Sequence, residues 1–254
     1  MDHTTATRQA PGAASSTLTQ VQRLDMYAGI HKALRLFLTD TLVKVGHTDA
    51  ADAAHVRDTL AQVRALLSSM RKHLQHENDF IHPALERARA GASGPIADEH
   101  VAHLDAIDEL QDLASVAEAA DGQARATAIG RLYRALALFV AENLEHMHYE
   151  ETEHNAVLWA HYTDAQLLEL HDALVASIPP DEMTQTLYWM LPAMAAHERL
   201  ALLSEMQPHV PAPVFDAVLG LARARLTSTD WGKLARGLGV PAAPQTWPEY
   251  VPLR

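Results

Sequence analysis

The residues best suited to chemistry in this sequence are two histidine–glutamate pairs with the same spacing. His146 stands four residues before Glu150, and His73 stands four residues before Glu77. On a helix this spacing places both side chains of a pair on one face, one turn apart. An imidazole and a carboxylate placed in this way can share one metal ion, or one can bind while the other bridges. The two pairs therefore predict a two-metal site with an approximate twofold design.

Three further histidines are candidates to complete this site. His31 precedes His73 by 42 residues and His103 precedes His146 by 43, and this near-equal spacing indicates an internal repeat. His100 stands one helical turn before His103. A single histidine on an apolar face is usually a packed or capped side chain, but agreement across four helices argues for metal binding. The candidate metal ligands are His31, His73, Glu77, His100, His103, His146 and Glu150.

The number of candidate ligands indicates which metal would fit. Two six-coordinate ions need roughly twelve ligand positions, and five histidines, two bridging carboxylates and one bridging oxide or hydroxide fill about eleven. The remaining position favours two iron ions that bind O₂ or a similar diatomic molecule. If only one of His100 and His103 coordinates, a second position opens and the centre becomes more reactive. Zinc is the alternative metal, because imidazole suits it too.

Long helices must position these side chains. Apolar residues recur at helical spacing over about 18–45, 49–90, 96–119 and 124–162, with short connections between these segments. Pro83 is expected to kink or locally break the second helix. The pattern predicts an all-α protein built on an antiparallel up-down four-helix bundle with additional C-terminal helices.

The sequence divides into four parts by composition. We expect a disordered tail over 1–17, the four-helix bundle over 18–162, additional helices over 163–240 and an extended tail over 241–254. The additional helices carry Trp189, Met190 and Trp231, and an apolar helical stripe of this kind is usually core. We therefore expect them to form an extra layer on the bundle. A lid or the surface of a homodimer is the functional alternative.

Composition excludes several classes of function. The chain has 254 residues and a formal net charge of −12, which disfavours nucleic acid or an acidic membrane surface as a partner. It has no cysteine, which excludes iron–sulfur clusters, thiolate zinc sites, disulfides and cysteine nucleophiles. We find no membrane-spanning run and no secretion signal, so a cytoplasmic protein is expected.

The pattern of His31, His73-x-x-x-Glu77, His100 with His103, and His146-x-x-x-Glu150 resembles the hemerythrin-like (HHE cation-binding) family over about residues 20–162. The resemblance implies an antiparallel four-helix bundle with a non-haem di-iron centre. By it, His31 and His73 would serve one iron, and His103 and His146, with His100, would serve the other. Glu77 and Glu150 would bridge. The pattern departs from the oxygen carriers, which have an aspartate in place of Glu150 and a spacing of four between the third-helix histidines.

The other histidines are expected to have lesser roles. Those that flank the pairs, namely His76, His82, His148 and His154, are expected to be solvated or to support the ligands. We expect surface or capping positions for His161, His171, His197 and His209. Tyr27 and Tyr149 could donate hydrogen bonds near the centre.

The function expected from the sequence is that of a non-haem di-iron protein. It would bind O₂, NO or a peroxide at an open iron position, in sensing, detoxification or storage of that ligand. One alternative is a di-iron oxidase or a peroxide-decomposing enzyme. Another is an all-α interaction protein that holds zinc or no metal.

Overall fold

The computed structural model describes residues 23–242, and these residues form helices and no strands. The expected tail over 1–17 lies outside the described residues, as does most of the tail over 241–254. The helices are α1 (Ala28–Gly46), α2 (Ala53–His76), the π-helical turn η1 (Glu77–Ile81), α3 (His82–Ala88), α4 (Gly94–Ala119), α5 (Gly122–Tyr149), the π-helical turn η2 (Glu150–His154), α6 (Asn155–His161), α7 (Asp164–Ser177), α8 (Pro180–Ala193), α9 (Ala196–Met206), α10 (Ala212–Arg225) and α11 (Ser228–Leu238).

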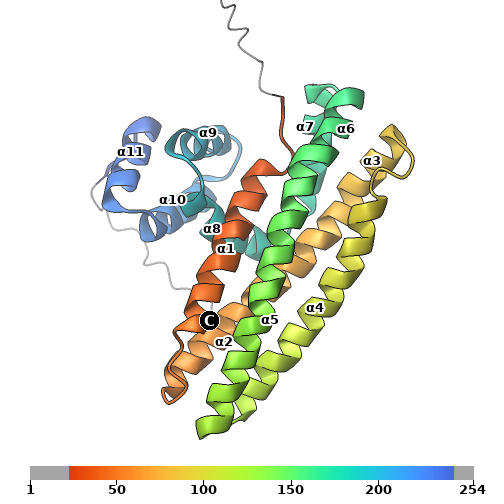
Figure 1. The fold of residues 1–254 in the computed structure, drawn as a ribbon. Coiled ribbons are helices and arrows are strands. Elements are labelled where there is room, and N and C mark those ends of the chain that lie inside the picture. The colour runs from red at the N-terminus through yellow and green to blue at the C-terminus, as the bar shows by residue number, and fades with distance from the viewer. Residues whose placement is uncertain (1–22, 243–254) are drawn as a thin grey trace, which may run out of the picture.

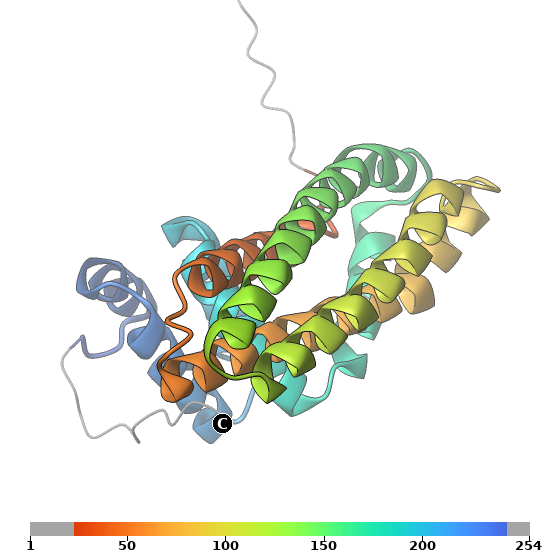
Figure 2. The same cartoon turned by 60° about the horizontal axis from the view of Figure 1, so that its bottom comes forward.

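Four long helices lie side by side and form the main body of the molecule. Helix α1 contacts α2 and α5, and α4 contacts the other sides of α2 and α5, so that the four close a ring. Figure 1 shows the four helices running along one another, and Figure 2 shows the same bundle from a view turned by 60°. This ring allows side chains distant in sequence to meet in its interior.

The helix boundaries follow local capping groups. Helix α1 begins at Ala28, later than the sequence indicated, because the carboxylate of Asp25 accepts hydrogen bonds from the backbone N–H groups of Tyr27 and Ala28. Helix α2 begins after Asp52, whose carboxylate accepts from the N–H groups of Ala54 and His55. These carboxylates satisfy N–H groups that the first turn of a helix leaves without a partner.

Two five-residue π-helical turns interrupt the helices that carry the histidine–glutamate pairs. In η1 the N–H of His82 donates to the carbonyl of Glu77, and in η2 the N–H of Asn155 donates to the carbonyl of Glu150. Each turn thus begins at the glutamate of a pair. The irregularity expected near Pro83 takes this form. The second π-turn contains no proline that would indicate an irregularity in the sequence. Such turns often occur at functional sites.

The apolar core of the bundle has two separate parts. The larger cluster holds Leu34 of α1, Leu74 of α2 and Met147 of α5 among its members. The smaller cluster holds Tyr27, Ile81 of η1, Leu85 of α3, and Val157 and Leu158 of α6. Along each of these helices the candidate ligands lie between members of the two clusters. The polar site is therefore a layer within the core, with apolar side chains on both sides.

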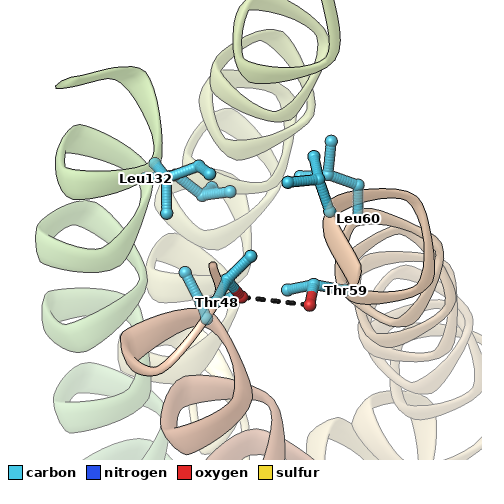
Figure 3. A pocket seen from close by; sticks show the side chains of 7 residues that line it. Thr48, Thr59, Leu60 and Leu132 are labelled. Carbon is cyan, nitrogen blue, oxygen red and sulfur yellow. Dashed lines mark hydrogen bonds between the residues drawn. The ribbon is translucent and has the colours of Figure 1, made fainter. Parts of the chain in front are cut away.

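The end of the bundle farthest from this layer is packed by apolar residues. A narrow cleft there is lined by Val45, Thr48, Val56, Thr59, Leu60, Ile129 and Leu132. Figure 3 shows the hydroxyls of Thr48 and Thr59 joined by a hydrogen bond, 3.0 Å long, beneath the side chains of Leu60 and Leu132. The polar atoms at this end thus find partners within the protein.

The C-terminal helices form a further layer beside the bundle. Helix α8 packs against α1, and the ring of Trp189 stacks on Phe37 with the ring centroids 4.0 Å apart. Helices α8 to α11 share a separate apolar cluster that includes Leu191, Leu203 and Trp231. Pro192 lies inside α8, which ends at Ala193, and α9 begins at Ala196. The extra layer expected from the apolar stripe is thus present.

None of the helices within residues 23–242 has the length and hydrophobicity needed to cross a membrane.

Candidate metal centre

The structure brings six of the seven candidate ligands into two adjoining clusters inside the bundle. Within each cluster, every residue offers one nitrogen or oxygen atom that lies within 4.8 Å of the others, and all these residues are buried. The first cluster is His31, His73, Glu77 and Glu150. The second is Glu77, His100, His146 and Glu150. The two carboxylates belong to both clusters, which is the arrangement that bridging ligands need.

The two oxygens of Glu77 face different histidines. Its Oε1 lies 3.2 Å from Nε2 of His73 and 3.8 Å from Nε2 of His31. Its Oε2 lies 3.5 Å from Nε2 of His100. Glu77 therefore presents one oxygen to the histidines of the first cluster and the other oxygen to a histidine of the second.

Glu150 is divided in the same way. Its Oε2 lies 3.4 Å from Nε2 of His31, and its Oε1 lies 3.5 Å from Nε2 of His146. The pair of carboxylates thus presents one oxygen each to the His31 side and one oxygen each to the side of His100 and His146. The approximate twofold design expected from the repeated spacing is present in this geometry.

The polar atoms that converge here have no hydrogen-bond partner among the described residues. They are Nε2 of His31, His73, His100 and His146 and both carboxylate oxygens of Glu77 and Glu150. A buried ionised carboxylate without a partner is costly, and buried charges in proteins are normally paired or coordinate metals. Imidazole and carboxylate together suit iron and zinc cations. The residues present therefore fit a pair of bound cations.

The two buried carboxyl groups respond differently to their surroundings. Burial, together with the nearby charge of Glu77, raises the pKa of Glu150 to about 8. Burial also opposes ionisation of Glu77, but the imidazoles of His73, His100 and His31 hold the pKa of Glu77 well below its ordinary value. Two carboxylates so close together resist carrying charge at the same time, and a cation between them would remove this conflict.

Burial keeps two of the histidines neutral. It lowers the pKa of His73 to about 4 and that of His146 to about 2. A neutral imidazole is the form that binds a metal ion. His31 differs: burial lowers its pKa, but the carboxylates of Glu150, Glu151 and Glu77 outweigh that effect and raise it to about 10.

Three imidazoles have a polar partner at Nδ1, the ring nitrogen other than the Nε2 that faces the carboxylates. Nδ1 of His31 lies 3.1 Å from a carboxylate oxygen of Glu151, and Arg35 in turn donates to Glu151.

The other two oriented rings use single partners. Nδ1 of His100 lies 2.9 Å from Oδ1 of Asn78, and Nδ1 of His146 lies 2.8 Å from Oε2 of Glu99. Each such contact places the N–H on Nδ1 and leaves Nε2 with its lone pair toward the site. Neither the spacing nor the hydrophobic pattern of the sequence indicated these partners.

His103 is buried beside the clusters and belongs to neither of them. Its ring centroid lies 4.7 Å from that of His146 and 5.9 Å from that of Phe139. Its Nδ1 has no hydrogen-bond partner among the described residues. Of the two histidines of α4 between which the sequence left a choice, the structure places His100 with the carboxylates.

Of the two roles expected for His82 and His154, solvation is wrong, because both side chains are buried, and support of the ligands stays a prediction. Together with Glu150 they form a third group whose ligand atoms lie within 4.8 Å of one another. His154 stands four residues after Glu150, the same spacing as in the two pairs, and this signal could have revealed it. Tyr27 was expected to hydrogen-bond near the centre, and its hydroxyl lies 3.1 Å from Nδ1 of His154.

The other histidines considered from the sequence belong to none of these groups. His148 is exposed and His76 is half-buried, with its Nε2 3.5 Å from Glu182. The surface positions expected for the C-terminal histidines are confirmed, because His161, His171, His197 and His209 are exposed.

Fold and site together define a class: an all-α protein with buried histidines and shared carboxylates in groups that could hold metal cations. The comparison with family models identifies the class more closely, because residues 23–157 match the hemerythrin HHE cation binding domain. The chain belongs to this family. Helices α7 to α11 lie beyond the matched residues. Comparisons with curated proteins and with solved structures gave no match.

Proposed function

We propose that this protein holds two bridged, non-haem iron ions and binds O₂, NO or a peroxide at an open iron position, in sensing, detoxification or storage of that ligand. The observation that carries the proposal is the division of Glu77 and Glu150, each with one oxygen on either side of the centre. Membership of a cation-binding family supports it.

The ligand assignment follows the two clusters. His31 and His73 would hold one ion, His100 and His146 the other, and the two glutamates would bridge. Four imidazoles and two bridging carboxylates fill about eight of the roughly twelve positions that two six-coordinate ions require. Iron is proposed over zinc because the two carboxylates would bridge the ions and the unfilled positions suit a six-coordinate metal. Bound iron would supply the open coordination position and the capacity for redox change.

The chain's own residues would hold this centre in a dry and oriented state. The apolar clusters on either side of the layer, with Leu74 and Met147 on one side and Ile81 and Leu158 on the other, restrict entry of water. Glu99, Asn78 and Glu151 fix the rings whose Nε2 atoms face the carboxylates. We also propose that the bundle has the antiparallel up-down topology, which its short connections favour.

The placement of His103 favours a second candidate, a di-iron oxidase or a peroxide-decomposing enzyme. Because His103 lies outside both clusters, four rather than five imidazoles face the carboxylates. More positions then stay open, and the centre is less suited to reversible binding. Exposure of the reduced protein to air separates the two functions: a spectral change that reverses on removal of O₂ supports a binder, and an irreversible one with turnover of peroxide supports the enzyme.

Metal analysis of the protein made in iron-replete cells tests the proposal directly. We expect about two irons per chain, one per histidine–carboxylate cluster, with near-ultraviolet absorption from an oxo bridge. Zinc alone, or no metal, would contradict it and favour an interaction protein.

Single variants test the ligand assignment. His73→Ala and His146→Ala should each lose one metal ion, because each removes a ligand from a different cluster. His148→Ala is a matched control, since His148 lies on the same helix as His146 and is exposed. Retention of both ions in His73→Ala and in His146→Ala would refute the assignment.

A further inference from the structure

A third group of metal-ligating side chains lies beside the two clusters, and the proposed di-iron function does not use its histidines. It consists of His82, His154 and Glu150, each of which offers an atom within 4.8 Å of the other two. His82 is the first residue of α3, and Glu150 and His154 are the first and last residues of η2. All three are buried, with exposed fractions of 7%, 1% and 0% for His82, His154 and Glu150.

This group is distinct from the two-metal clusters in its membership. Among the described residues, His82 and His154 assemble with Glu150 and with none of the four histidines that face the carboxylates. The ring of His82 stacks on that of His100 with the centroids 4.8 Å apart, so the ring of His100 lies next to this group without joining it. The group therefore marks another position for an ion, on the α3 and α6 side of the layer.

Both histidines have a nitrogen ready to coordinate. Nε2 of His82 and Nε2 of His154 are buried and have no hydrogen-bond partner within residues 23–242. The other nitrogen of His154, Nδ1, lies 3.1 Å from the hydroxyl of Tyr27, which fixes the ring. Each buried imidazole nitrogen without a partner costs free energy, as the unpartnered imidazole nitrogens of the main clusters do. A ligand that accepts electron pairs from both would remove that cost.

We infer that His82, His154 and Glu150 form a third cation site, which takes a transition metal ion such as Fe²⁺ or Zn²⁺. Two imidazoles and one carboxylate are a donor set with which proteins hold these ions while leaving coordination positions open. Glu150 can take part because a carboxylate has about four lone-pair positions, and its bridging role occupies only one on each oxygen. The site would make the centre trinuclear, with Glu150 as the residue common to all three ions.

The third ion should bind more weakly than the other two. Each main cluster offers four residues with two carboxylates, whereas the third offers three residues with one carboxylate, which is already shared. A third divalent charge also adds repulsion to a buried site that holds two cations. Occupation in order of affinity is therefore expected, the third ion entering at higher free metal concentration.

Equilibrium dialysis of the metal-free, full-length protein against buffered Zn²⁺, with metal measured by mass spectrometry, tests the site. The wild type should reach a plateau of about three ions per chain, one per group of ligands, and His82→Gln/His154→Gln should reach about two. His148→Gln, which removes an exposed histidine, should behave as the wild type does.

The outcomes separate this inference from the proposed function. A wild-type plateau of two, or an unchanged plateau in the double variant, would overturn the third site while leaving the two-metal centre intact. A fall below two in the folded double variant would overturn it as well, because these histidines would then serve the main pair. A wild type that takes up no metal would overturn both proposals.

Tyr27→Phe supplies a test that does not depend on the double variant folding. The change keeps the ring of this fully buried side chain and removes only the hydroxyl that contacts His154. Loss of such a partner typically weakens metal binding by about 10- to 100-fold. We expect that decrease for the last Zn²⁺ to bind and none for the first two. An equal effect on all ions, or no effect on the last, would contradict the site.

Discussion

The two ends of the bundle use the same helices in opposite ways. At the end near Thr48 and Leu132 the interior is apolar, and its few hydroxyls bond to one another (Figure 3). At the other end a layer of buried imidazoles and carboxylates interrupts the core, and its inward-facing atoms have no partner in the described residues. Packing alone completes the first end, whereas the second contains buried polar atoms that bound cations would satisfy.

Removal of metal should therefore produce the largest difference between the ends. A ligand present at about a thousand times its dissociation constant stabilises the folded state by about 4 kcal/mol. Dialysis against a chelator should lower the free energy of unfolding by at least about that amount. Amide exchange should accelerate more around Glu77 and Glu150, where local opening adds to the change in global stability, than around Leu60. Equal acceleration at both ends would contradict the division.

Leu67→Ala should weaken the apolar part of the core and spare the metal centre. Leu67 lies on α2 and is fully buried in the larger cluster, and such truncations cost about 2 to 5 kcal/mol. Denaturant unfolding would measure the loss, and metal analysis should give unchanged stoichiometry. Leu138→Ala is a matched control, because Leu138 is 67% exposed on α5. A comparable loss in both variants would show that burial is not the cause.

Glu99→Leu should affect the metal layer and leave the apolar end unchanged. The variant removes the acceptor on Nδ1 of His146, and loss of such a partner lowers metal affinity by about 10- to 100-fold. Glu99→Gln retains an acceptor oxygen and should lose less. Glu145→Gln serves as a control for charge, since Glu145 is an exposed acid near Glu99. Competition with a chelator would measure each affinity, and equal values for Glu99→Leu and Glu145→Gln would show that orientation of His146 is unimportant.

Glu86→Gln should have the smallest effect, confined to the connection between α3 and α4. The carboxylate of Glu86 accepts from the N–H of Gly91 and from the N–H and hydroxyl of Ser93. The hydroxyl of Ser93 and these N–H groups lower the pKa of Glu86 from 4.5 to about 2. A lowered pKa means that the contribution is present above pH 4.5 and disappears as the pH falls toward 2.

Thermal unfolding of the metal-free protein across that range would test this. The wild type and Glu86→Gln should differ slightly at pH 6 and converge near pH 2. A constant difference across the range would show that ionisation of Glu86 is not responsible.

Much of the site could be predicted from the sequence because regular helices have a fixed period. The spacing of four between His73 and Glu77, and between His146 and Glu150, was sufficient to place each pair on one face. The all-α fold followed from the apolar periodicity in the same way. Both inferences depend only on contacts within one helix.

Features that depend on contacts between helices could not be predicted. Asn78 and Glu99 reach His100 and His146 from neighbouring helices, and nothing in the sequence marks them. The choice between His100 and His103 depends on the rotation of α4 against the bundle. His82 was missed because it stands five residues after Glu77, a spacing that a regular α-helix would turn away from the site.

The π-turns make the centre depend on the length of the chain as well as on residue type. In η1 one additional residue lies within the turn, so that the N–H of His82 reaches the carbonyl of Glu77. Deleting a single residue from this segment would restore the ordinary helical screw, rotating α3 by about 100° and drawing it back by about 1.5 Å. Leu85 would then leave the apolar cluster and His82 would point elsewhere, although both of these residues had been retained. No substitution at another position can undo such a change of phase.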